Sequence, residues 1–223
     1  MKMSWDGALT AILVACALTT TAVLLHKEFF ASRDIGISDR PVFIKDWRAH
    51  LEKGQRVGSP DAPVQLIEFF DYECPHCATF HVTLENLRRI YPQQTAISFV
   101  HYPLPGHDYA EPAARAAECA GEQGFFESMH SVLFDKQRAL GSGAWRDFAQ
   151  QAGVRDLQLF VSCIDTDQPR HRIKEGKRLG EQLGVRGTPT LIINGWKFSR
   201  PPSAEELDHM IKLALAGKKP AFN

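Results

Sequence analysis

The chain has 223 residues, of which 44% are hydrophobic and 23% charged, and its 26 Lys+Arg balance its 26 Asp+Glu. This composition is typical of a globular protein and excludes wholesale disorder, a collagen-like fibre and a polytopic membrane protein. A formal net charge of zero gives no basic field that would attract nucleic acid, so no nucleic-acid partner is expected. Five cysteines are too few for a disulfide-dense miniprotein but enough for a redox pair.

The amino-terminal region, residues 1–28, contains an uncharged apolar run from Ala8 to Leu25. As a helix this run would extend roughly 27 Å, just enough to cross the hydrocarbon core of a bilayer. We therefore expect an uncleaved single-pass membrane anchor. A cleaved secretory signal and a lipoprotein signal acylated at Cys16 remain alternatives. A buried core helix is a further alternative, although the run lacks the polar stripe that such a helix normally shows.

The segment 29–58 mixes charges with a short apolar patch and is interpreted as a tether and lead-in, because it is too short for a domain. After a Gly/Pro-rich loop, the mostly apolar run 64–70 predicts a buried strand. Helical periodicity follows over 78–91, and 96–102 predicts a second strand. This strand–helix–strand order predicts a parallel strand pair.

The remainder of the chain divides into a helical block and a short β segment. Residues 110–183 have helical patterns and no strand signal. Asn194-Gly195, between short β runs at 190–193 and 196–198, predicts a hairpin. An amphipathic helix over 203–216 begins with a capping box formed by Ser203 and Glu206, and 217–223 is a tail.

The motif Cys74-Pro75-His76-Cys77 lies at the predicted junction of the first strand and the helix that follows it. The first turn of a helix exposes unpaired N–H groups, which stabilise a thiolate and lower its pKa below about 8.5. Cys77 follows one turn later, within bridging distance, and His76 adds a potential cation. A stabilised thiolate favours the reduced form, so this motif predicts an oxidising disulfide.

Other uses of a Cys-x-x-Cys motif fit this sequence less well. Structural zinc would need two further ligands at suitable spacing, and the sequence shows none, so no metal is expected. Covalent haem attachment would need His at position 78, where the chain has Ala78. A purely structural disulfide would close too small a ring to stabilise the fold much.

The stretch from Ala62 to Cys77 resembles the active-site region of the DsbA-like thiol:disulfide oxidoreductases of the bacterial cell envelope. The resemblance continues through Tyr102-Pro103-Leu104-Pro105 and through Gly187-Thr188-Pro189-Thr190, and covers roughly Val57 to Ala216. It implies an α/β thioredoxin-like fold over 59–216 with an inserted helical domain at about 109–184.

The resemblance also implies a role for each matching residue. Cys74 would be the nucleophile and Cys77 the buried resolving thiol, with no cofactor beyond this pair. Pro189 would be a cis-proline facing them. Thr188 stands where well-studied oxidases have valine, and threonine also occurs in isomerase and reductase relatives. Glu68 matches a buried acid of the family, and its pKa would be raised so that it could shuttle the proton of Cys77; a satisfied acid without a kinetic role is the alternative.

A second disulfide occurs in some relatives of the family, which implies a Cys119–Cys163 bridge here. The alternative is two buried free thiols packed as small apolar groups. Asp71 and Glu73 are interpreted as solvated loop acids. Four further histidines (His101, His107, His130 and His171) are interpreted as structural or surface residues, because their spacing fits no metal site.

The function implied is that of a membrane-tethered, extracytoplasmic oxidoreductase of the bacterial envelope, periplasmic in its catalytic domain, that oxidises thiols of secreted proteins. Its partners would be reduced envelope proteins and a DsbB-like or VKOR-like membrane oxidant for recycling. A monomer is expected, because no dimerisation domain fits in 29–58. A reductase or isomerase of the same fold and a non-enzymatic thiol chaperone are the alternatives.

Overall fold

The computed structural model describes residues 18–21, 40–166, 168–198 and 200–218. The chain divides into two units, Met1–Ser38 and Asp39–Asn223. In the first unit, the described residues 18–21 form an exposed helical turn. The expected membrane anchor over 8–25 otherwise lies outside the described residues, and none of the helices in the described part of the chain has the length and apolar character needed to cross a bilayer.

The second unit is built on a six-stranded mixed sheet with the strand order β1-β6-β5-β3-β4-β2. The strands are β1 (Val42–Phe43), β2 (Gln55–Gly58), β3 (Val64–Phe70), β4 (Thr95–His101), β5 (Thr190–Ile193) and β6 (Trp196–Phe198). β3 and β4 pair in parallel, connected by helix α2 (Pro75–Ile90), and the other neighbours pair antiparallel. The predicted parallel pair and the predicted hairpin are both present.

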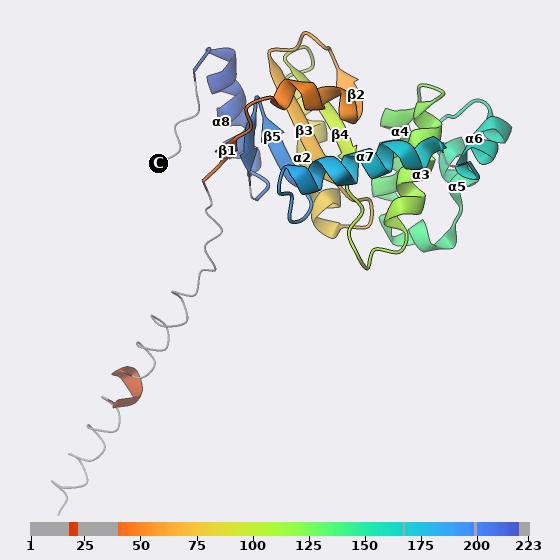
Figure 1. Ribbon diagram of the computed structural model, residues 1–223, viewed down its shortest axis with the longest axis horizontal. Coiled ribbons are helices and arrows are strands. Elements are labelled where there is room, and N and C mark those ends of the chain that lie inside the picture. The colour runs from red at the N-terminus through yellow and green to blue at the C-terminus, as the bar shows by residue number, and fades with distance from the viewer. Residues whose placement is uncertain (1–17, 22–39, 167, 199, 219–223) are drawn as a thin grey trace, which may run out of the picture. The chain divides into compact units, whose positions relative to one another are not determined.

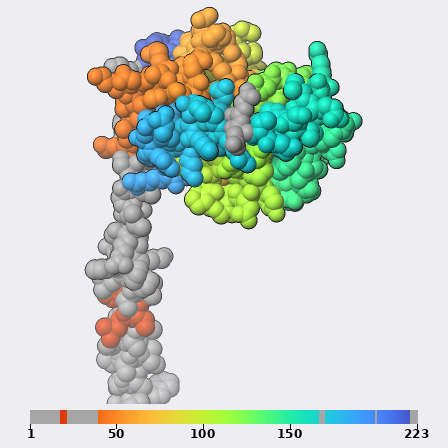
Figure 2. All heavy atoms as spheres, turned by 45° about the vertical axis from the view of Figure 1, so that its right-hand side comes forward, coloured from red at the N-terminus to blue at the C-terminus, as the bar shows by residue number. Residues whose placement is uncertain are grey.

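The two faces of the sheet are covered by different helices, as alternation along β3 requires. Leu66 and Phe70 pack on the side of α2 and α8 (Ala204–Leu215), whereas Ile67 and Phe69 pack on the side of the 3₁₀ helix η1 (Trp47–Lys53) and α7 (Gln168–Gln182). Figure 2 shows η1 (orange) and α7 (blue) side by side on one surface of this unit. Glu68 shares the parity of Leu66 and Phe70, so it faces the α2 side.

The predicted helical insertion lies at one end of the sheet (Figure 1). It contains α3 (Ala110–Gly121), α4 (Phe126–Asp135), the 3₁₀ helix η2 (Gln137–Ser142), α5 (Trp145–Gln151) and α6 (Leu157–Ile164). Buried apolar residues from several of these helices, among them Met129, Leu133 and Phe160, join the core beside α2. Helix α7 then leads the chain back along the sheet, and Gly184, with φ +65°, follows its last turn.

The segment 42–58 contributes more structure than the sequence indicated. β1 and β2 form the two edges of the sheet, and η1 between them buries Trp47 and Leu51. At Gly54 a side chain would clash, because a Cβ there would lie 2.5 Å from the carbonyl oxygen of Phe99. The folded unit therefore begins before the Gly/Pro-rich loop at 59–63.

Candidate active site

Cys74 occupies the N-cap position of α2, between the end of β3 and the first helical turn. Its carbonyl accepts hydrogen bonds from the backbone N–H groups of Cys77 (3.1 Å) and Ala78 (3.2 Å), and Pro75 occupies the first turn, where no N–H is needed. Cys74 and Cys77 are both free thiols and both buried. The strand–turn–helix sequence thus places the motif where an anion is best stabilised.

The environment of Cys74 strongly favours its thiolate. A hydrogen bond from the Cys77 thiol has the largest effect and lowers the pKa of Cys74. Burial acts in the opposite direction, but hydrogen bonds involving Thr188 and the backbone N–H groups of Cys77 and His76 lower the pKa further. Together they lower the pKa of Cys74 to about 5. The His76 side chain is exposed, so its backbone N–H, rather than the cation expected from the sequence, is what this residue contributes to the shift.

Cys77 and Glu68 are shifted in the opposite direction. Burial is the largest cause that raises the pKa of the Cys77 thiol far above its ordinary value, and the hydrogen bond to Cys74 and the charge of Glu68 add to it. Burial alone raises the pKa of Glu68 to about 8. At neutral pH one sulfur is therefore an anion, the other a thiol, and the acid on β3 is protonated.

Thr188 and Pro189 come to the site from the segment just before β5, more than a hundred residues along the chain. The Thr188–Pro189 peptide bond is cis, Pro189 is buried, and the Thr188 carbonyl oxygen lies 3.3 Å from Cys74 Sγ. The Thr188 hydroxyl is also buried at the site, and the Thr188 side chain contributes to the lowered pKa of Cys74. The structure therefore brings Cys74, Cys77, Thr188 and Pro189 together.

Asp71 holds the loop before Cys74, and its interpretation as a solvated acid is wrong. Its side chain is fully buried, and both carboxylate oxygens have partners. Oδ1 accepts the Glu73 N–H (2.7 Å), and Oδ2 accepts the Leu104 N–H (2.8 Å) and lies 2.8 Å from His107 Nδ1. The Asp71 carbonyl accepts the Cys74 N–H (3.2 Å). A carboxylate with several donors at one turn fixes the approach of β3 to α2.

Gln137 on η2 is a site residue that sequence reasoning missed. Its amide nitrogen donates to the carbonyls of Tyr72 (2.8 Å) and Cys74 (3.0 Å), so the helical insertion is hydrogen-bonded directly to the redox loop. No local pattern marks such a residue, because its significance arises only when η2 is folded against the loop.

The histidines outside the motif have distinct environments. His101 pairs with buried Glu118 (2.9 Å), which also accepts from Arg172 (2.9 Å) and ties β4, α3 and α7 together. Buried His130 lies 2.9 Å from the Tyr72 hydroxyl, and burial lowers its pKa well below 6.5. Their interpretation as structural residues agrees with these positions, whereas His107 touches the redox loop.

Cys119 and Cys163 form a disulfide between α3 and α6, with an S–S distance of 2.01 Å. This disulfide lies in the helical insertion, far along the chain from the Cys74 loop, and neither of its sulfurs is bonded to Cys74 or Cys77. The two cysteine pairs of the unit are therefore in different states: one bridged, one carrying free thiols.

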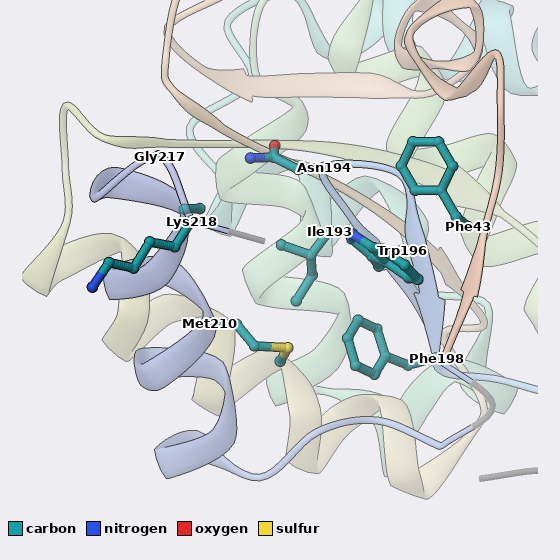
Figure 3. Close-up of a pocket in the computed structure, with 9 residues that line it drawn as sticks. Phe43, Ile193, Asn194, Trp196, Phe198, Met210, Gly217 and Lys218 are labelled. Atoms are coloured by element: carbon teal, nitrogen blue, oxygen red, sulfur yellow. The ribbon is translucent and has the colours of Figure 1, made fainter. Parts of the chain in front are cut away.

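A separate apolar cavity of about 490 Å³ lies between α8 and the β5–β6 hairpin. Figure 3 shows Ile193, Phe198 and Met210 turned toward one another across it, with Trp196 beside them and Lys218 at its margin. None of the redox-site residues lines this cavity.

Comparison with known proteins places this arrangement in a family. Residues 50–213 match the family described as Thioredoxin. The fold resembles those of BdbD from Bacillus subtilis (TM-score 0.68, 22% identity, covering 81% of this chain and 98% of that one) and of the thiol-disulfide exchange protein alpha-DsbA2 from Wolbachia pipientis (0.60, 21%, 74% and 92%).

A curated relative has a different kind of name. Na(+)/H(+) antiporter NhaA 3 of Salinispora tropica is 32% identical over 187 residues, which cover 82% of this chain but 27% of that protein. The chain thus spans about a quarter of the length of that relative. The ion transport that the name describes refers to that longer protein. By the family match the chain belongs to the thioredoxin family, and the expected likeness in fold to the DsbA-like proteins is confirmed.

Proposed function

We propose that this chain is a protein thiol:disulfide oxidoreductase that works mainly as an oxidase of protein thiols outside the cytoplasm. The observation that carries the proposal is the opposed ionisation of the two sulfurs: the pKa of Cys74 is lowered to about 5, while that of Cys77 is raised. A stabilised Cys74 thiolate favours the dithiol form, so the Cys74–Cys77 disulfide is a strong oxidant.

The proposed reaction moves two electrons from a substrate dithiol to the enzyme disulfide. A substrate thiolate attacks Cys74 Sγ, the Cys74–Cys77 bond breaks, and Cys77 leaves as a thiolate. A second substrate thiolate then attacks the substrate sulfur of the mixed disulfide, which forms the substrate disulfide and releases the Cys74 thiolate. Cys74 is an efficient leaving group because its thiolate is held by the N–H groups of α2.

Glu68 supplies the proton that Cys77 needs in this scheme. Its raised pKa of about 8 keeps it protonated at neutral pH, and once ionised its charge raises the pKa of Cys77, so the two groups interact. The Cys77 thiolate that leaves is strongly basic in its buried position, so it takes the proton of Glu68. The Glu68 carboxylate then regains a proton from solvent. The Thr188 carbonyl lies against Cys74, with Pro189 after it in a cis peptide bond, and an extended substrate segment would bind there.

An extracytoplasmic location is supported by the second cysteine pair and by the amino-terminal sequence. A structural disulfide such as Cys119–Cys163 persists in oxidising compartments and is rare in the cytosol. The uncharged run 8–25 has the length and composition of a single membrane span. We propose that it tethers the domain to the bacterial inner membrane, with the catalytic unit in the periplasm.

The recycling partner in this proposal is a DsbB-like or VKOR-like membrane oxidant, which accepts the two electrons from the Cys74–Cys77 dithiol. Substrates are reduced secreted or envelope proteins, and the enzyme acts as a monomer. A membrane-tethered donor and a membrane-embedded acceptor meet by diffusion in the plane of the bilayer, which favours their encounter.

Two assays and a titration test the proposal on the full-length chain. Oxidised protein is expected to speed disulfide formation in a reduced test protein, and its equilibrium with glutathione is expected to give a potential of about −120 mV. A potential of about −270 mV with efficient insulin reduction would instead assign it as a reductase. Inactivity in both assays would favour a thiol-binding chaperone. Carbonate-resistant sedimentation with membranes, and mass spectrometry of the mature amino terminus, test the tether.

A further inference from the structure

His107 is brought to the redox loop by the connection between β4 and α3. Its Nδ1 lies 2.8 Å from Asp71 Oδ2, and the same Asp71 accepts the Cys74 N–H through its backbone carbonyl. Asp71 therefore joins His107 and Cys74 within one turn. The His107 side chain is about one quarter exposed, whereas Asp71 is fully buried. The imidazole therefore lies at the edge of the site, with its Nδ1 side facing the buried carboxylate.

The orientation of the imidazole follows from its partner. A carboxylate accepts hydrogen bonds only, so His107 donates through the N–H on Nδ1, and its second ring nitrogen, Nε2, is left for protonation. The loop itself is braced, because the Leu104 N–H donates to Asp71 and the Leu104 carbonyl accepts the His107 N–H (3.2 Å). The ring is thus held in one orientation beside the β3–α2 turn.

Charges around His107 favour its cationic form. Burial lowers its pKa and is the largest single effect, but the hydrogen bond to Asp71 and the negative charges of Asp71, Glu73 and the Cys74 thiolate outweigh burial and raise the pKa above its ordinary value. These three groups, all on the β3–α2 connection, are the titratable groups that act on the ring, and Asp108 follows it on its own loop.

Electrostatic coupling between two titrating groups is reciprocal. Because the Cys74 thiolate stabilises protonated His107, protonated His107 must stabilise the Cys74 thiolate by the same free energy. The hydrogen bonds from Cys77 and the backbone are the main favourable contributions at Cys74, and by this reciprocity the imidazolium of His107 adds to them.

We propose that His107, oriented by Asp71, is a positioning residue of the redox site whose positive charge stabilises the Cys74 thiolate and links the thiol–disulfide equilibrium to pH. The effect on oxidant strength rests on the proposed function, whereas the coupling between His107 and Cys74 is a property of the reduced protein itself. The imidazolium stabilises the reduced form below the pKa of His107, and this contribution is lost as pH rises through it. The disulfide is therefore a weaker oxidant on the alkaline side.

The direct test is the titration of His107 by NMR in the full-length chain, followed at the imidazole Cε1–H signal in the reduced and in the oxidised protein. Reduction creates the Cys74 thiolate, so we expect a higher pKa for His107 in the reduced state than in the oxidised state. Equal values in the two states would overturn the proposal. This readout needs no substrate, so it stands even if the protein catalyses no thiol exchange.

A matched pair of variants gives the second test. His107→Asn keeps an amide donor near the Nδ1 position but removes the charge, and we expect it to raise the pKa of Cys74 by about 0.3 to 1 unit, which lowers the equilibrium constant with glutathione about 2- to 10-fold at pH 7. His171→Asn is the control, because that histidine is 80% exposed on α7 and should change neither value. An unchanged Cys74 pKa in a folded His107→Asn protein would contradict the proposal. If that variant does not fold, the NMR comparison on the wild-type chain decides alone.

Discussion

The two cysteine pairs of this unit are chemically alike but are placed to do opposite things. Cys74 and Cys77 are separated by one helical turn at the beginning of α2, where N–H groups point at the sulfur. Cys119 and Cys163 are 44 positions apart and join two helices of the insertion, α3 and α6. The first pair gains its reactivity from unsatisfied backbone donors and a buried partner, whereas the second closes a long loop and stabilises the fold.

Substitution of Cys74 is expected to have the largest effect on activity. Cys74→Ser should reduce thiol–disulfide exchange to the uncatalysed background, because the attacked sulfur is gone. Oxidative refolding of a reduced test protein by the full-length chain measures it. The control is the double variant Cys119→Ala/Cys163→Ala, which should keep its exchange activity. Loss of exchange in the double variant while it remains folded would break the division of labour between the two pairs.

Removal of the second pair is expected to have the largest effect on stability. Cys119→Ala/Cys163→Ala should lower the free energy of unfolding by about 3–4 kcal/mol, because the disulfide no longer restricts the unfolded chain over a 44-residue separation. Urea unfolding of the two proteins measures the difference. A loss below about 1 kcal/mol would show that the bridge is not what stabilises the insertion.

The acid beneath Cys77 should affect rate more than equilibrium. Glu68→Gln removes the proton donor, and we expect the reaction with substrate to slow by about tenfold, below the usual range for general acid–base catalysis. The folded pKa of Glu68, about 8, lies above its unfolded value, so burial of the acid costs stability increasingly from about pH 4.5 up to pH 8.

Glu68→Gln should therefore make unfolding less sensitive to pH over that range, while Glu52→Gln, an exposed acid on η1, should not. Stopped-flow kinetics and unfolding at several pH values measure the two effects. Unchanged rates together with an unchanged pH profile would leave Glu68 as a structural acid.

His130 tests the contact of the insertion with the redox loop from the other side. Its folded pKa lies well below 6.5, so the neutral ring contributes stability that is present above pH 6.5 and is lost as pH falls below it. His130→Phe should flatten this acid limb of the stability profile, at a cost of about 1–3 kcal/mol at pH 7 for the unpaired Tyr72 hydroxyl. An unaltered acid limb would assign the acid sensitivity to another group.

The smallest expected effect is that of Gln137. Gln137→Ala removes two hydrogen bonds to the Tyr72 and Cys74 carbonyls and should lower the free energy of unfolding by about 1–2 kcal/mol. Gln158→Ala, on α6, is the comparison variant. Because the Cys74 sulfur keeps its own donors, the pKa of Cys74 should change little. A large rise in that pKa would show that the insertion tunes the site rather than merely bracing it.

The sequence was informative where a local pattern determines a local structure. The strand at 64–70, the Asn194-Gly195 hairpin and the capping box of Ser203 and Glu206 are all present. The parallel pairing of β3 with β4 followed from the strand–helix–strand order. The placement of Cys74 at the beginning of a helix followed from the proline after it and the strand before it.

Features that depend on distant parts of the chain were missed. β1 and β2 are short edge strands whose residues carry little β pattern, and they exist because β6 and β4 offer unpaired edges. Asp71 looks like any loop acid until the β4–α3 loop folds over it. Gln137 and His107 have no distinguishing neighbours in the sequence, since their partners lie more than 30 residues away.

The amino-terminal end of α2 and the thiol of Cys77 hold Cys74 as a thiolate. Thiolate absorbance at 240 nm, followed against pH in the reduced full-length chain and corrected with Cys74→Ser, measures it directly. We expect a single ionisation with a midpoint near pH 5 and no second one in the neutral range. A midpoint between about pH 8 and 9, the range of an ordinary cysteine, would contradict it.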